Sequence, residues 1–495
     1  MSAPYTKIGL IQNSPLPGDF SANLRAIVQG YRECLDHGAE IVLAPADALC
    51  GIAPRDLSKR ASFLQQMRAA FNALSHELGS APLLTCGYSS PISEEDLWDG
   101  LLGEEENDPE QPAPDLCIVP FLVEKDTVSE LDDGEVNFID EHTVFVCIGE
   151  EEMLPDTEPC DLMVHFGTEP WHTNAPVQDA EARSWEGRTN GTPVACLRPY
   201  GVAGSSVYGG GSSLHDAEGN LALRLPLFRS GAAVADLRHP KPVPALPTPE
   251  TQMRNALELG IRDTVRHHGY GGVCLPLDHP NSTLLAALAV SALGSSNVCG
   301  ITFSHNTAAA KALGIDVLEW TQGDMPTTAA EVAGIDEDSF RQALTARIRA
   351  AMMQTYAESR GLMLLSPIDR HAALTGDFTL YGDTCGHLAP LGNLYQVDIY
   401  LLSCQFREEH SELFGALAQP ADSTQDRILH ELADLNIGAA DLLAKQGILF
   451  KENDVRFLQR RLISTALRRQ QLPTVLHVDP LQERLSLPTN HRLND

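Results

Sequence analysis

Apolar and polar residues follow two different periods along the chain, and the clearest change of period lies between residues 271 and 296. This stretch reads GGVCLPLDHPNSTLLAALAVSALGSS. It predicts a short buried strand at Val273–Leu275, a turn, and a helix that Gly294 ends. The apolar positions of the helix are Leu284, Leu285, Leu288, Ala292 and Leu293. Because a helix N-terminus carries partial positive charge and free N–H groups, this order is typical of phosphate sites in doubly wound α/β domains.

The first half of the chain combines two amphipathic helices with many short strands. The helices are expected at Ser21–His37 and Ser58–Leu78, and HDAEGN within Ser212–Leu225 predicts a hairpin. Strands are expected at Lys7–Gln12, Ile41–Ala46, Pro82–Tyr88, Asp115–Val123, Val144–Glu150, Asp161–Phe166 and Pro193–Arg198. Strand–helix–strand pairs followed by a strand-rich region indicate an α/β sandwich.

Prolines mark the division between the two halves. Residues 239–249, HPKPVPALPTP, contain five prolines among eleven residues, which predicts a stiff and extended linker. We therefore expect a domain at 1–238, a linker at 239–250 and a second domain at 251–495. In the second domain, helices are expected at Thr251–His268 and Ser339–Tyr356, and strands at Asn297–Phe303 and Gly361–Leu365.

The composition excludes some classes of binding partner but says little about the fold. The 495 residues are 43% hydrophobic and 21% charged, values that are ordinary for a globular protein. The net charge of −32 argues against binding to nucleic acid or to an anionic membrane, since both require basic patches. Part of the acidity lies in Glu94–Asp115, for which we expect a solvated loop.

The cysteine pattern and the apolar runs bear on location. Eleven cysteines are scattered without a CxxC pair, and several lie in strand-like runs, so we expect reduced core thiols. No signal pattern begins the sequence, and no apolar run approaches the ~20 residues of a membrane-spanning helix. The expected location is the cytoplasm.

The turn at Leu277–Ser282 resembles the first turn of the NAD synthetases, which belong to the ATP-pyrophosphatase group. In that family the turn reads SGGxDS, and here it reads LDHPNS, so only Ser282 matches. Asp278 would repel a polyanion, and Pro280 has no N–H to donate. Asn281 and Ser282 are the nucleotide-binding candidates that this resemblance leaves in the turn.

His279 is one exception to the argument that this turn repels phosphate. An unperturbed His279 has a pKa near ~6.5, so it would be cationic in acid and could attract a phosphate.

The first domain resembles the nitrilase, or glutamine amidotransferase, domain of glutamine-dependent NAD synthetases. The landmarks that carry this resemblance are Gly18–Leu24, Pro45–Leu57, Val144–Glu151, Asp161–Trp171, Ala182–Leu197 and Gly209–Leu225. The implied fold is an α-β-β-α sandwich, followed by a doubly wound parallel sheet of the adenine nucleotide α-hydrolase type.

The catalytic positions implied by this resemblance are altered. The family uses a Cys nucleophile, a Glu base and a Lys that stabilises the oxyanion. The Glu position holds Ala46, with Asp47 beside it, and the Cys position holds Gly149. Cys147 lies two residues earlier, where a core role is expected. Lys125 is the nearest lysine candidate, and an exposed, solvated side chain is the alternative.

The second domain keeps family motifs but changes their reactive residues. Asp377–Pro390 (DFTLYGDTCGHLAP) and Asn393–Leu402 (NLYQVDIYLL) are similar to the family's GYxTLYGDxxGGxAP and DVxKTxVYxLA. The family's magnesium-binding acid is Ala372 here, and its phosphate-binding Lys is Gln396. The further nucleotide-binding candidates are Arg347, Arg349, Thr379 and Asp383. They either shape the domain through an Arg–carboxylate pair and a capped turn, or they form a residual nucleotide pocket.

Three functions remain open at this point. The first is a homologue that has lost both family reactions and acts as a regulatory, scaffolding or ligand-sensing oligomer. It would assemble through the nitrilase-like domain, with an active synthetase or another protein as a possible partner, and it requires no cofactor. The second is an active synthetase that uses ATP and magnesium with shifted residues, namely Asp47, Cys147, Asp278 or Asn281. The third is new chemistry at His279, His305 or His371.

Overall fold

The computed structural model describes residues 5–89, 117–149, 159–305, 307–414, 423–446 and 449–478. The acidic run Glu94–Asp115 lies outside these ranges. The chain divides into two units, one of residues 1–203 with 207–246 and the other of residues 204–206 with 247–495. Each unit is described here by itself.

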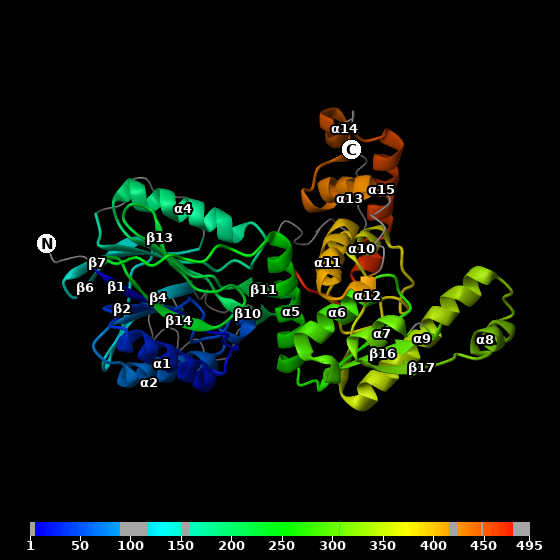
Figure 1. Cartoon of the computed structure of the whole chain (residues 1–495), viewed down its shortest axis with the longest axis horizontal. Helices are drawn as coiled ribbons and strands as arrows, with labels where there is room; N and C mark the ends of the chain where they lie inside the picture. The colour runs from blue at the N-terminus through cyan, green and yellow to red at the C-terminus, as the bar shows by residue number, and fades with distance from the viewer. Residues whose placement is uncertain are drawn as a thin grey trace, which may run out of the picture. The chain divides into compact units, whose positions relative to one another are not determined.

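The N-terminal unit contains two six-stranded sheets (Figure 1). In spatial order, the first sheet consists of β14 (Gly231–Asp236), β1 (Lys7–Gln12), β2 (Ile41–Leu43), β3 (Leu83–Ser89), β4 (Cys117–Glu124) and β5 (Thr127–Glu130). The second consists of β13 (Leu221–Arg224), β12 (Ser213–His215), β9 (Val194–Leu197), β8 (Leu162–Phe166), β7 (His142–Ile148) and β6 (Glu135–Ile139). A separate strand pair comprises β10 (Tyr200–Ala203) and β11 (Ser206–Gly209).

Helices cover the outer faces of this sandwich. The helices are α1 (Phe20–Asp36), a 3₁₀ turn at Arg55–Leu57, α2 (Ala61–Glu77) and α4 (Ala175–Asn190). Figure 1 shows α1 and α2 on one side of the unit and α4 on the other. The strands alternate as their sequences predict: Ile8 and Leu10 of β1 are buried between the sheets, whereas Ile11 lies in the core beneath α1 and α2. The unit is therefore a four-layered α-β-β-α sandwich.

The second unit is built on a four-stranded, fully parallel sheet. Its spatial order is β17 (Asp316–Glu319), β16 (Val298–Thr302), β15 (Gly272–Pro276) and β18 (Leu362–Leu364). The helices of this part are α5 (Pro249–His267), α6 (Ser282–Leu293), α7 (Ala308–Leu313), α8 (Met325–Ala333) and α9 (Asp338–Arg360). The chain moves outward from β15 to β17 and then returns to the other side of β15 at β18. This reversal is the switch point at which doubly wound sheets bind ligands.

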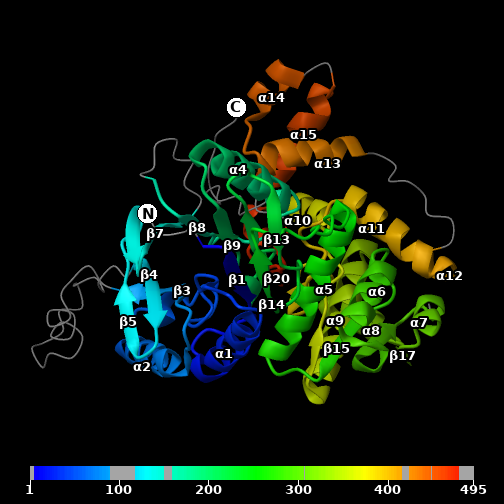
Figure 2. The ribbon, with the colours of Figure 1, turned by 60° about the vertical axis from the view of Figure 1, so that its left-hand side comes forward.

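The remainder of the second unit is largely helical (Figure 2). It comprises α10 (Arg370–Thr375), α11 (Gln396–Glu409), α12 (Ser411–Phe414), α13 (Ser423–Leu429), a π-helical turn at His430–Asp434, α14 (Ala439–Gln446), α15 (Glu452–Ser464) and α16 (Ala466–Arg469). The short strands β19 (Leu388–Ala389) and β20 (Thr474–Val475) pair in parallel. Ile428, Leu432 and Leu458 are buried in a core that these helices share.

The structure confirms the predicted fold class and most of the expected elements. The central strand, the turn and the helix that Gly294 follows are all present. Most boundaries differ from the expected ones by no more than two residues, but three expected boundaries are further off. The helix expected to end at Tyr356 continues to Arg360. The second strand stops at Leu43, because Pro45 has no N–H to extend the ladder. The helix expected from Ser58 begins at Ala61, since a 3₁₀ turn precedes it.

Within the ranges that the structure describes, no helix has both the length and the apolar character needed to cross a membrane.

The approach of β15 to the residues before β16 gives a prediction for stability. A Cβ atom added at Gly272 would lie 2.4 Å from the carbonyl oxygen of Asn297, and backbone cannot move aside cheaply. We expect Gly272→Ala to reduce the free energy of unfolding by about 1–3 kcal/mol, the usual cost of overpacking. Gly271→Ala is the matched control, because the nearest atom to its added Cβ lies at 3.9 Å. Urea unfolding of both variants would contradict this view if they were equally stable.

Candidate functional site

A cavity of about 450 Å³ opens at the carboxyl ends of the parallel strands in the second unit. Its volume lies within the range of small-molecule sites, and its place is the switch point of the sheet. The strand ends contribute Pro276, Asp278, His279, Phe303, Leu364 and Pro367. Helix α9 contributes Asp338, Arg341, Gln342, Thr345, Ala346, Arg349 and Met353, and the segment before β19 contributes Gly382, Asp383 and Cys385.

Asp278 lies where the related turn has a glycine, and its carboxylate holds the end of β16. Oδ1 accepts hydrogen bonds from the hydroxyls of Thr302 and Ser304, both at 2.6 Å, and Oδ2 accepts one from the Phe303 amide at 2.7 Å. Burial acts to raise the pKa of Asp278, but these hydrogen bonds and the nearby Arg349 outweigh it and hold the pKa below its usual value. The cavity wall therefore carries a full negative charge at neutral pH.

His279 also lines the cavity, and it is neutral. Its Nδ1 accepts a hydrogen bond from the Asn281 amide at 3.2 Å, which leaves the proton on Nε2. Burial lowers the pKa of His279, against the opposing influence of Asp369 and Asp383. The expectation of an unperturbed imidazole that attracts phosphate in mild acid is therefore wrong, since burial moves the charged form to lower pH.

A closed set of hydrogen bonds occupies the corner behind the turn. The buried Asn281 amide donates to the Pro367 carbonyl at 3.2 Å and to Oδ2 of Asp369 at 2.8 Å. The same Asp369 oxygen accepts a hydrogen bond from Gln396, while the other oxygen accepts the Ala372 amide at 2.8 Å. The side chain of Ala372 packs beside an apolar cluster that contains Phe378.

These contacts do not fit a magnesium ion. The family's acid is absent at Ala372, and both oxygens of Asp369 already accept hydrogen bonds, Oδ1 from the Ala372 amide and Oδ2 from the side chains of Asn281 and Gln396. Among the described residues, no group of three or more His, Cys, Asp or Glu side chains is arranged to hold a metal.

Asn281 and Ser282, the two nucleotide-binding candidates of the turn, have different surroundings. Asn281 is fully engaged within the corner. Ser282 begins α6 and is buried, and its Oγ has no hydrogen-bond partner within the described part of the chain. Neither residue lines the cavity itself.

The four remaining candidates separate into two pairs. Arg349 and Asp383 line the cavity, with the Arg349 guanidinium 4.9 Å from the centre of the Phe303 ring. Arg347 points elsewhere and donates to the Leu380 carbonyl at 3.1 Å. Thr379 donates its amide to Asp383 at 2.7 Å, which caps the turn. Arg347 and Thr379 thus shape the domain.

Sequence reasoning missed Arg341, which also faces the cavity. It precedes Arg349 by eight residues on the same helix, so the helical period places both on one face. That period was the available signal.

In the N-terminal unit, Ala46 and Asp47 follow the end of β2. Both are buried. Asp47 accepts hydrogen bonds from the Ala53 amide and, at 3.4 Å, from the Tyr88 hydroxyl. Burial raises the pKa of Asp47 to about 6 despite these donors.

The nucleophile position is a glycine in a conformation suited to glycine. Gly149 follows β7 directly and has φ +94°. Its amide donates to the Phe166 carbonyl at 2.9 Å, and an added Cβ would meet no atom within 4 Å. Cys147 is 2% exposed and packs with Phe145 and Met163. The core role expected for Cys147 is confirmed.

Lys125 is exposed in the turn between β4 and β5. Val123 of β4 pairs with Leu83 of β3, and Leu43 at the end of β2 pairs with the next residue, Leu84. The solvated side chain expected as the alternative is therefore confirmed, whereas a role of Lys125 at the family's lysine position stays a prediction.

The two other histidines are held outside the cavity. His305 is exposed and lies 2.6 Å from Glu319. His371 lies 2.8 Å from Asp426, and this hydrogen bond raises the pKa of His371 above its usual value. Neither ring lines the cavity that His279 faces.

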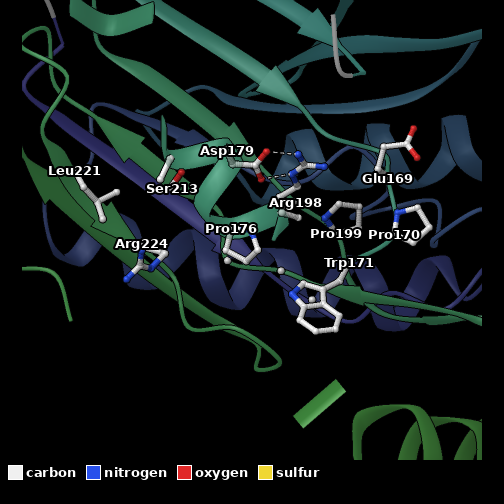
Figure 3. Close-up of a pocket in the computed structure, with 15 residues that line it drawn as sticks. Glu169, Pro170, Trp171, Pro176, Asp179, Arg198, Pro199, Ser213, Leu221 and Arg224 are labelled. Carbon is white, nitrogen blue, oxygen red and sulfur yellow. Dashed lines mark hydrogen bonds and ion pairs between the residues drawn. The ribbon is translucent and has the colours of Figure 1, made fainter. Parts of the chain in front are cut away.

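A second cavity, in the N-terminal unit, lies between α4 and the strands that follow it (Figure 3). The Arg198 guanidinium and the Asp179 carboxylate form an ion pair in its wall, with Nε and Oδ2 2.8 Å apart. The cavity of about 20 Å³ has room for one water molecule. The buried indole N–H of Trp171, which has no partner in the described part of the chain, is a donor for such a water.

The raised pKa of Asp47 predicts how stability depends on pH. The folded state holds this proton up to about pH 6, whereas the unfolded chain loses it near pH ~4, so Asp47 weakens folding progressively between these values. We expect Asp47→Asn to gain up to about 3 kcal/mol of stability relative to wild type at pH 8, and little at pH 4. Urea unfolding at both pH values measures the difference, and a gain of equal size at each would contradict the assignment.

Known proteins match both units. Residues 253–408 match the family model for NAD synthase. The glutamine-dependent NAD(+) synthetase of Thermotoga maritima is 25% identical over 471 residues, with 80% of this chain and 79% of that protein covered.

Solved structures agree on the fold. A glutamine-dependent NAD(+) synthetase from Cytophaga hutchinsonii superposes with a TM-score of 0.81 at 13% identity and covers 98% of this chain and 97% of its own. The enzyme from Acinetobacter baumannii in complex with ADP gives a TM-score of 0.72 at 19% identity, with 95% of each chain covered. The chain is therefore similar in sequence and in fold to the glutamine-dependent NAD(+) synthetases, and its residues 253–408 match the NAD synthase family model.

Proposed function

We propose that this chain has lost both reactions of the NAD synthetase family and acts as a ligand-sensing regulatory oligomer. The family makes NAD from deamido-NAD, ATP and ammonia taken from glutamine. The observation that carries the proposal is the closed corner behind the turn, where Asn281, Asp369 and Gln396 bond to one another.

The turn opposes a triphosphate for two reasons. A phosphate nest needs several converging N–H groups, and Pro280 supplies none. Asp278 adds repulsion worth roughly 1–4 kcal/mol per phosphate charge at about 4 Å. The dipole of α6 offers only about 0.3–1 kcal/mol in return. The balance therefore disfavours ATP at this turn.

The nitrilase-like unit gives matching support. The base position is Ala46 and the nucleophile position is Gly149, neither of which can accept a proton or form an acyl-enzyme. Cys147 is enclosed by apolar side chains, where glutamine would need a path through the core.

Regulation requires a partner, and the sequence limits its class. We propose a homo-oligomer formed through the nitrilase-like unit, located in the cytoplasm, with an active synthetase or another protein as its target. The net charge of −32 disfavours nucleic acid and anionic membranes as alternatives.

The family reaction itself is the second candidate. Similarity along four fifths of the chain favours it, and the Acinetobacter baumannii relative holds ADP. An active enzyme would have to recruit Asp47 as base and Cys147 as nucleophile, with Asp278 and Asn281 at the nucleotide.

We expect no glutaminase activity. Treatment with an electrophilic glutamine analogue, followed by mass spectrometry of the intact protein, should leave the mass unchanged, since the buried Cys147 has no access to the reagent. Cys147→Ala is the control variant. A stoichiometric adduct in wild type that this variant lacks would establish Cys147 as nucleophile and sink the proposal.

We also expect no magnesium-dependent binding of ATP. Calorimetric titration at pH 8, where Asp278 is charged and His279 neutral, should give no saturable heat with or without magnesium. Tight binding that magnesium strengthens would instead support the active synthetase.

A further inference from the structure

The walls of the large cavity combine apolar surface with few free positive charges. Phe303, Met353, Leu364, Pro276 and Pro367 provide the apolar part. This mixture suits a flat organic ring more than a polyanion.

One of the two arginines of the cavity is paired with carboxylates. Arg341 forms ion pairs with Asp336 and, at 3.3 Å, with Asp338. Arg349 stacks on Phe303 and donates its Nε–H to Gln322 at 3.2 Å, and its positive charge helps to keep the pKa of Asp278 low. Part of the positive charge of this wall is therefore already balanced by carboxylates of the chain itself.

Carboxylates outnumber these cations along the cavity. Asp278, Asp338 and Asp383 lie in its wall, against Arg341 and Arg349. Asp369 adds a buried carboxylate behind His279, where it partly opposes the lowering of that ring's pKa by burial. The cavity wall therefore carries more negative than positive groups, which disfavours a phosphate there.

Neutral donors remain for an uncharged ligand. His279 presents its Nε2–H, because Nδ1 is occupied by the Asn281 amide. Gln342 of α9 adds an amide to the same wall, and the Thr345 hydroxyl, which donates to the Arg341 carbonyl at 2.7 Å, adds an acceptor. Ring nitrogens and hydroxyls are suitable partners for such groups.

We propose that this cavity binds an uncharged ligand of nucleoside size, and that Asp278 is the residue that excludes phosphorylated forms. The inference rests on the proposed function, in which the cavity binds without turnover. Asp278 is suited to this role because three donors fix its carboxylate at the cavity wall.

The test compares adenosine, AMP and ATP, which share one nucleoside and differ in charge. Calorimetry of the full chain at pH 8 and low salt should show adenosine binding to wild type, AMP binding at least about tenfold more weakly, and ATP binding not at all. Asp278→Asn should strengthen AMP binding by about tenfold and change adenosine binding less than twofold, because it removes one charge and keeps an oxygen acceptor.

Two further variants keep the test decisive. Asp383→Asn removes a second wall charge and should shift AMP binding in the same direction, should Asp278→Asn fold poorly. Asp316→Asn removes an exposed charge on β17, outside the cavity, and should change nothing.

The inference would be overturned if wild type bound AMP as tightly as adenosine, or if both cavity variants bound AMP with unchanged affinity. It would also be overturned if adenosine at about 1 mM, a concentration that detects even weak binding, showed no binding. Nucleotide binding without product would refute this inference alone, whereas turnover would refute the proposed function.

Discussion

The second unit depends on the carboxylate of Asp278, which ties the turn after β15 to the end of β16. Its two oxygens satisfy two hydroxyls and a backbone amide that would otherwise face the cavity. A glycine turn leaves that space for the oxygens of a phosphate. Here the protein supplies its own anion, so the strand ends are held without a ligand. In the function proposed above, the same charge repels the phosphate that the related turn accommodates.

The corner behind this turn is also held by the protein's own side chains, but here the donors are neutral amides. Gln396 in place of a lysine and Ala372 in place of an acid remove one positive and one negative charge together. Asp369 then accepts hydrogen bonds from the two amides of Asn281 and Gln396, so these three polar side chains satisfy one another. An acid restored at position 372 alone would add a second carboxylate close to Asp369, which is costly in a buried site.

Sequence predicted the architecture well because the hydrophobic periods are strong. The alternation of Ile8, Leu10 and Ile11 and the apolar helix after β15 specify sheets and layers directly. The candidate site was harder, since a motif places residues along the chain and says nothing of direction. Lys125 is close to the expected position in sequence, but its exposure in the turn between β4 and β5 is visible only in the fold.

Two other features of the candidate site could be recognised only from the three-dimensional structure. Arg347 and Arg349 belong to one motif, yet only Arg349 faces the cavity, because two residues on a helix differ by about 200° in direction. The lowered pKa of His279 depends on its burial, for which the turn sequence gives no signal.

The most direct test of the account is whether the chain makes NAD. The full protein is incubated with deamido-NAD, ATP, magnesium and ¹⁵N-ammonium. Because ammonium replaces glutamine as the nitrogen source, this assay bypasses the N-terminal unit and tests only the second unit, with its turn at Leu277–Ser282 and the corner of Asn281, Asp369 and Gln396. The account predicts no ¹⁵N-labelled NAD above a protein-free control, while the Thermotoga maritima relative serves as positive control. Labelled NAD in proportion to protein concentration, lost in Asn281→Ala, would contradict it.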